Sequence, residues 1–311
     1  MKKTLLKYSL LFFIPVIGVS ILMEALVLKM PASYKNNSNY YIENHDLIEI
    51  IALGSSQMAG AINPEYFDKP AICLASSSQH HKLDFTIFKQ LQLNSKKIKY
   101  VIIELSPNHL ELPHNSKKFW KNSVYLKYFN VNAFERKTYF KDELIYLSNP
   151  DLYSKKIMEY YLLNTGNTQL NKYGYNSDMS GSIFKKYNFD KIEIDKLKTH
   201  PNQLENPEIF KHNTAYLFSM LSYFRENNIH PIICTLPLYK TFRNNLNTNN
   251  VTRRDSIISV IKTKFPETTF FEAEKDTANF KIYDFSNANH LNPDGAKKLT
   301  LKLNEIINKI E

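Results

Sequence analysis

The stretch DLIEIIALGSS (46–56) points most directly to the class of fold. Its mostly apolar run is of strand length and ends in three small residues, Gly54, Ser55 and Ser56. Such a run, bounded by turn residues, is typical of a strand buried in a parallel sheet. Four further stretches have the same character: PAICLA (70–75), KYVIIEL (99–105), HPIICTL (230–236) and TTFFEA (268–273). Helix-length amphipathic segments lie between or after them, which predicts an α/β fold with a parallel sheet covered on both faces. These segments are 79–95, 208–228, 252–264 and 293–309.

The composition of the 311-residue chain is that of a globular protein, with 43% hydrophobic residues. No G-x-G-x-x-G or G-x-x-x-x-G-K-[ST] motif occurs, so the common phosphate-binding loops are excluded and no cofactor is expected. Cys73 and Cys234, the two cysteines, fall inside expected strands and are interpreted as buried small hydrophobic residues. Of the net charge of +10, residues 1–35 carry +4, and the rest is spread as lysine pairs without an arginine-rich stripe, so we expect no nucleic-acid partner.

The N-terminus predicts a membrane anchor over residues 1–30. The segment YSLLFFIPVIGVSILMEALVL (8–28) spans roughly 31 Å as a helix, about one bilayer core. Lysines precede it, which places the N-terminus in the cytoplasm and the body of the protein outside the cytoplasmic membrane, in the periplasm or at the cell surface. A cleaved signal peptide is the alternative, although no clear cleavage site follows. The Asn- and Ser-rich residues 31–45 are expected to be a tether.

The remaining residues, 46–311, form the predicted α/β domain, and 110–207 interrupts it. This insertion is rich in aromatic residues, among them Trp120, Tyr125 and Tyr160, and has no clear period. Two interpretations remain open: the core of a helical subdomain, or a wall of aromatic rings that faces a glycan.

Polar residues follow three of the expected strands and precede the last helix. They are Gly54-Ser55-Ser56, Ser76-Ser77-Ser78, Ser106-Pro107-Asn108 and the segment DFSNANHLNPDG (284–295). Ligand sites of parallel sheets lie beyond the carboxyl ends of the strands, where these segments converge. A Ser, an Asn and a His that meet there fit nucleophilic acyl transfer.

These motifs resemble those of the SGNH, or GDSL-like, hydrolase superfamily over roughly 46–108 and 208–311. Ser56 matches the nucleophile of that family, and His290, in Asn287-Ala288-Asn289-His290, matches the catalytic base. Ser76 lies near the block that donates a backbone N–H to the oxyanion, and Asn108 matches the Asn of the oxyanion hole. The resemblance implies a flavodoxin-like sheet.

The sequence departs from the family pattern in three places. Ser55 replaces the Asp beside the nucleophile, and no Gly occupies the second block, so Ala75 and Ser76 have to supply its N–H. Asn287 replaces the Asp that orients the catalytic His and stabilises its charged form. Asp284, three residues upstream, is a candidate substitute for that carboxylate.

Two other groups of residues are weaker candidates for a site. Glu104, near the end of a buried strand, either lines the site or is a paired structural carboxylate. His80-His81 and His109/His114 lack ligand partners at a recognisable spacing, so no metal site is expected.

Two hypotheses about function follow. The first is an extracytoplasmic serine acyl-transfer enzyme, an O-acetyltransferase or acyl esterase that acts on a cell-envelope polysaccharide. The resemblance to the membrane-anchored branch of the family, similar to polysaccharide O-acetyltransferases and D-alanine transfer proteins, implies a polytopic membrane acyltransferase as partner. The second is a catalytically inactive protein of the same fold that binds glycan or scaffolds a biosynthetic complex. Asn287 is the residue that keeps the second hypothesis open.

Overall fold

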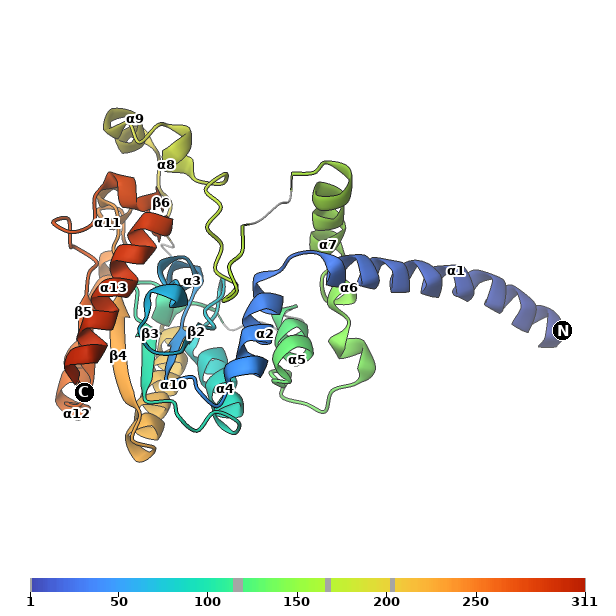
Figure 1. Cartoon of the computed structure of the whole chain (residues 1–311), viewed down its shortest axis with the longest axis horizontal. Helices are drawn as coiled ribbons and strands as arrows, with labels where there is room; N and C mark the ends of the chain where they lie inside the picture. Colours follow the sequence, from blue (N-terminus) through green and yellow to red (C-terminus); the bar gives the residue numbers. More distant parts are fainter. Residues whose placement is uncertain (1, 114–119, 166–168, 202–204, 311) are drawn as a thin grey trace. The chain divides into compact units, whose positions relative to one another are not determined.

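The computed structural model describes residues 2–113, 120–165, 169–201 and 205–310. Its centre is a five-stranded sheet in which every neighbouring pair is parallel, in the order β2-β1-β3-β4-β5. Each strand lies within one of the five predicted stretches, and the order is that of flavodoxin-like sheets, so the predicted fold class is confirmed. The strands are β1 (Ile50–Leu53), β2 (Ala71–Cys73), β3 (Tyr100–Glu104), β4 (His230–Thr235) and β5 (Thr269–Glu272) (Figure 1).

Helices cover the sheet because the strands bury apolar side chains on both faces. On one face, Ile50 of β1 and Ile102 of β3 share a hydrophobic cluster with Leu299 and Leu303 of α13 (Pro293–Ile310). Elsewhere, α4 (His81–Gln92) packs against α10 (Pro207–Glu226), and the rings of Phe88 and Phe224 meet edge to face at 4.8 Å. Helix α12 spans Thr248–Lys264, so all four predicted helices are present.

The chain divides into two compact units, and the sheet belongs to the one formed by residues 36–114 and 169–311. Residues 1–35 and 115–168 form the other unit. The predicted insertion 110–207 is therefore divided: its middle part belongs with the N-terminal helix, and its later part belongs with the sheet. Short helices in that later part are α8 (Ile183–Lys186) and α9 (Lys191–Lys196).

The N-terminal unit is helical and has its own small core. Helix α1 (Lys2–Lys29) packs against segments that include α6 (Ile145–Ser148) and α7 (Pro150–Ile157), through a cluster that contains Val27 and Tyr153. Helix α5 (Lys121–Phe129) contributes Val124, and Trp120 and Tyr160 pack against the same cluster. Burial of these aromatic side chains favours the subdomain-core interpretation of this part of the insertion.

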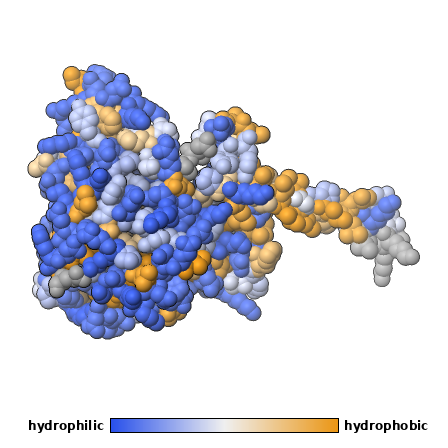
Figure 2. Space-filling model, viewed as in Figure 1, coloured by the Kyte–Doolittle hydropathy of each residue, from blue (hydrophilic) through white to orange (hydrophobic). Residues whose placement is uncertain are grey.

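Residues Lys7–Lys29 of α1 are long and apolar enough to cross a membrane, a property that signal sequences share. Apolar side chains cover this helix along most of its length (Figure 2). The carboxylate of Glu24 accepts the N–H groups of Ile145 and Tyr146, at 2.9 and 2.7 Å. The last turns of α1 therefore make protein contacts.

The expected tether is instead a helix, α2 (Ser33–Asn44). Two of its polar side chains bind carbonyl oxygens of the sheet-containing unit: the amide of Asn37 donates to Cys73, and the hydroxyl of Tyr41 donates to Leu91. These long-range hydrogen bonds fix a segment whose Asn- and Ser-rich composition alone favours a loop.

Candidate active site

Ser56 and His290 meet beyond the carboxyl end of the sheet. Ser56 is the first residue of α3 (Ser56–Ala61), directly after β1, and His290 begins β7 (His290–Leu291), just before α13. The Nε2 atom of His290 lies 3.0 Å from the Oγ of Ser56, although 234 positions separate the two residues. Both side chains are half-buried. This is the contact that a serine nucleophile and its general base require.

The other ring nitrogen of His290 faces two amide oxygens. Nδ1 lies 3.1 Å from the Oδ1 of Asn287 and 3.1 Å from the Oδ1 of Asn289. The Oδ1 of Asn287 also accepts the backbone N–H groups of residues 289 and 290, each at 3.0 Å. Of the two ends of the Asn287 amide, only the oxygen accepts a hydrogen bond from an N–H, so these bonds fix the orientation of the amide. Nδ1 therefore carries the proton, and Nε2 presents its lone pair to Ser56.

Burial lowers the pKa of the His290 imidazole below its ordinary value, and the negative charge of Glu104 opposes that shift. A lowered pKa keeps the ring neutral at neutral pH, which is the form that accepts a proton. The electrostatic environment of His290 thus suits a general base.

Glu104 organises the loop that carries the nucleophile. Its carboxylate, in a residue that is 1% exposed, accepts the backbone N–H of Ser55 at 2.7 Å and the hydroxyl of Ser55 at 2.9 Å. The hydroxyl of Ser106 lies 2.7 Å from the same carboxylate. Glu104 therefore ties the loops after β1 and β3 together and acts as a structural carboxylate, the second of the two roles left open by the sequence. Among the described residues, hydroxyl and backbone N–H donors take the place of an ion-pair partner.

Gly54 precedes the nucleophile loop and has no room for a side chain. A Cβ atom there would lie 2.6 Å from the Cβ of Glu104 and 2.7 Å from its Oε2, and the backbone has φ +149°. Glycine is needed at this position because the buried Glu104 side chain approaches the backbone so closely. The sequence shows a Gly after β1 and a Glu at the end of β3, but it does not show that the two residues meet.

Asp284, the candidate substitute for the missing carboxylate, does not contact His290. Its carboxylate accepts the backbone N–H of Lys281 at 2.7 Å and pairs with the ammonium of Lys298 on α13 at 2.7 Å. It therefore anchors the turn before α13 to that helix. The groups that hold His290 are the amides of Asn287 and Asn289.

The two predicted oxyanion donors differ in their environment. The backbone N–H of Ser76 donates to the carbonyl of Gly54 at 3.0 Å, which extends the β1–β2 pairing, so it is not free to bind an oxyanion. Asn108 lies two residues beyond Ser106, whose hydroxyl binds Gln57, the residue after Ser56. The Oδ1 of Asn108 accepts a long 3.4 Å bond from Asn250, which turns its oxygen toward α12 and leaves its NH₂ as the donor. The oxyanion role of Asn108 stays a prediction.

No protein-family model matches the chain, and no curated protein matches its sequence. Solved structures do resemble it. They include a GDSL-like lipase from Bacteroides thetaiotaomicron, at 9% identity and TM-score 0.42, covering 89% of this chain and 99% of that one. A predicted acylhydrolase from Bacteroides fragilis has 11% identity and TM-score 0.41, with coverage of 88% and 96%. A predicted lipolytic protein of the G-D-S-L family from Desulfitobacterium hafniense has 12% identity and TM-score 0.39, with coverage of 83% and 98%.

Proposed function

We propose that the protein is a serine-dependent acyl-transfer enzyme that cleaves or transfers an ester-linked acyl group. The observation that carries the proposal is the 3.0 Å contact between the Nε2 of His290 and the Oγ of Ser56. The nucleophile and the base lie near opposite ends of the domain's sequence. In the fold they meet at the edge of the sheet where ligands of such folds bind.

In the proposed reaction, His290 takes the proton of the Ser56 hydroxyl as Oγ attacks the carbonyl carbon of the ester. The amide NH₂ of Asn108 is the donor that we assign to the resulting oxyanion. Collapse of this intermediate breaks the bond to the leaving alkoxide, which takes the proton back from His290. The acyl group then sits on Ser56, and water or a second hydroxyl removes it by the same steps in reverse.

For the substrate we propose an acylated, most simply acetylated, cell-envelope polysaccharide outside the cytoplasmic membrane. The apolar helix α1 supports this, because it suits either an anchor or a signal sequence, and both deliver the domain to that compartment. Water as acceptor gives an esterase, and a sugar hydroxyl gives an O-acyltransferase. A polytopic membrane acyltransferase would supply the acyl group in the second case.

Two observations favour a different function. A neutral amide, Asn287, contacts the Nδ1 of His290 where a carboxylate would stabilise the imidazolium, and the N–H of Ser76 is already bonded to Gly54. A protein that retained the fold but bound glycan without turnover would tolerate both features. This scaffold is the alternative to the enzyme.

The test uses the full chain in detergent micelles with an activated aryl acetate, comparing the wild type with Ser56→Ala and His290→Ala. Ser219→Ala is a matched control, because that exposed hydroxyl bonds only within helix α10. We expect release of the aryl group and an acetyl adduct that both depend on Ser56, with a fall of at least about 10³-fold in each site variant and none in the control. Equal rates in wild type and both site variants would contradict the proposal. Absence of turnover and adduct in the wild type would favour the scaffold.

A further inference from the structure

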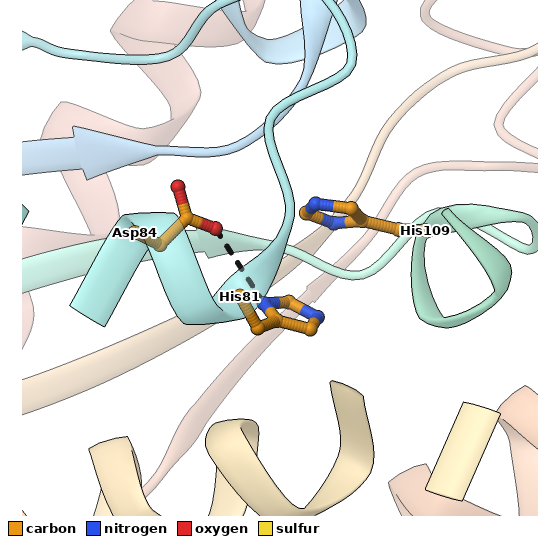
Figure 3. A group of neighbouring side chains, drawn as sticks. All are labelled: His81, Asp84 and His109. Atoms are coloured by element: carbon orange, nitrogen blue, oxygen red, sulfur yellow. Dashed lines mark ion pairs between the residues drawn. The ribbon is translucent and has the colours of Figure 1, made fainter. Parts of the chain in front are cut away.

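His81, Asp84 and His109 form a buried group of side chains apart from the Ser56–His290 pair (Figure 3). His81 and Asp84 lie in the first turn of α4, and His109 begins the turn after β3. The exposed fractions are 0%, 0% and 2%, and one potential ligand atom from each residue lies within 4.8 Å of the others. Two imidazoles and a carboxylate therefore converge in the protein interior.

Within the part of the chain that the structure describes, several polar atoms of this group have no hydrogen-bond partner. Both ring nitrogens of His81 and the Oδ2 of Asp84 are buried and unsatisfied. The Nδ1 of His81 lies 3.6 Å from that oxygen, which is too long for a hydrogen bond. Buried polar groups in native proteins nearly always have a partner, so these atoms point to something that binds among them.

The ring of His109 faces more acceptors than a neutral imidazole can satisfy. Its Nδ1 lies 2.8 Å from the carbonyl oxygen of Glu104, and its Nε2 lies 3.1 Å from the carbonyl oxygen of Gln79. A neutral imidazole has one N–H, so it satisfies one of these carbonyls and turns a lone pair toward the other. A metal bound through one ring nitrogen turns that nitrogen away from its carbonyl and leaves the other nitrogen to donate to its own carbonyl, which removes the conflict.

We propose that His81, Asp84 and His109 bind a divalent transition-metal ion, with zinc as the best-fitting metal. Imidazole nitrogen and carboxylate oxygen are common zinc ligands, and three protein ligands leave a fourth position for water or a carbonyl. The side-chain amide of Gln79 donates to the Oδ1 of Asp84 at 2.6 Å, which orients the carboxylate and leaves Oδ2 for the metal.

The spacing of the donors is compatible with such a site after small side-chain rotations. Ligand atoms of a tetrahedral zinc with bonds of about 2.0–2.1 Å lie roughly 3.3 Å apart. The 3.6 Å separation of His81 and Asp84 is already near this value, and rotation of the imidazoles closes the wider gaps. The linear spacing of these residues matches no familiar zinc motif, which is why the sequence predicted no metal. His114, the fourth histidine considered there, lies outside the described residues.

The metal would be structural. It would join the start of α4, after the β2 loop, to the turn after β3, in which His109 follows Asn108 directly. Its presence does not depend on the chemistry of Ser56, so Ser56→Ala should retain it.

The experiment measures metal in the full chain, purified in detergent from zinc-supplemented cells, by inductively coupled plasma mass spectrometry. We expect about one zinc per chain, and the visible absorption bands of a four-coordinate site after exchange for Co²⁺. In Asp84→Asn, a change of nearly equal volume, and in His81→Gln, we expect less than a tenth of that zinc. His80→Asn is the matched control, because this neighbouring histidine accepts the N–H of Leu83 as a helix cap, a role that Asn fills.

Circular dichroism checks that each variant is folded. If a ligand variant does not fold, zinc X-ray absorption of the wild type decides instead, with two imidazoles and only nitrogen and oxygen ligands expected. The proposal is overturned if the wild type carries no zinc and shows no Co²⁺ bands. It is equally overturned if folded Asp84→Asn and His81→Gln keep the metal, or if the absorption spectrum reveals sulfur ligands or no imidazole.

Discussion

Replacing Asn287 by Asp tests the proposed role of His290 most directly. The change is nearly isosteric, and a carboxylate oxygen can accept the same bonds from Nδ1 and from the N–H groups of residues 289 and 290. It adds one negative charge about 3 Å from the imidazole, without displacing the Nε2 that faces Ser56. We expect a faster enzyme whose activity requires a higher pH.

The magnitude follows from the geometry. Charges about 4 Å apart interact by about 4 kcal/mol at an effective dielectric constant of 20. His290 is only half-buried, so solvent screens part of this interaction, and we expect its pKa to rise by about one to two units. A base stronger by that amount raises kcat/KM by about 10- to 100-fold at most.

The assay is the pH dependence of kcat/KM for an aryl acetate. In the wild type, burial lowers the pKa of His290 below its ordinary value of about 6.5. The ring therefore stays neutral at pH 6.5, and we expect activity to fall only at a lower pH. In Asn287→Asp the pKa is raised, so the acid limb moves up by about one to two pH units while the plateau rises. Asn287→Ala removes one of the two acceptors that face Nδ1; it should slow the reaction and serves as the opposite control. An Asp variant with the wild-type plateau and the wild-type acid limb would refute the assignment of His290 as base.

Three further changes test the packing around the site by thermal unfolding. Gly54→Ala should destabilise the protein by more than about 2 kcal/mol, because the new Cβ would overlap the side chain of Glu104; an unchanged melting temperature would contradict that close approach. Glu104→Gln should cost about 2–4 kcal/mol and lower activity, since an NH₂ group would face donors such as the N–H of Ser55, and a neutral result would mean that the carboxylate is dispensable. Arg254→Ala should cost about 3–5 kcal/mol, because it leaves Glu274, 2.8 Å away, buried without its partner; Arg254→Ala/Glu274→Ala should recover part of the loss if that reasoning is correct.

The sheet was predictable from the sequence because each strand is a short apolar run that ends in turn residues. Register pairs such as Ile50 with Tyr100 fall inside stretches whose burial was evident from their composition. The division of the insertion was not predictable. It depends on contacts such as that of Glu24 with Ile145, across 121 positions, which no local periodicity encodes. Helix α2 was missed for the same reason, since Asn37 is held by a carbonyl of a distant strand.

The candidate site was predictable where a residue type at a strand end implies a role. Ser56 and His290 follow this rule, and the structure brings them together. Asp284 was a reasonable substitute by distance along the chain, but Lys298 on the following helix takes its charge instead. The backbone turn around a catalytic imidazole decides which groups orient it. Here the turn over residues 287–290 presents its own side-chain amide oxygens to the Nδ1 of His290.

We expect the Asn at position 287 to slow this protein less than an Asp-to-Asn change beside the catalytic His slows a serine protease. There, an Asn in place of the Asp lowers kcat by about 10⁴-fold because the imidazole takes the wrong tautomer. In this protein two backbone N–H groups hold the Asn287 oxygen toward Nδ1, so the productive tautomer is kept and only the charge is lost. The loss of charge alone corresponds to the rise in kcat/KM, about 10- to 100-fold at most, that we expect from Asn287→Asp. An amide in place of a carboxylate at position 287 is therefore compatible with a slow but working acyl-transfer enzyme.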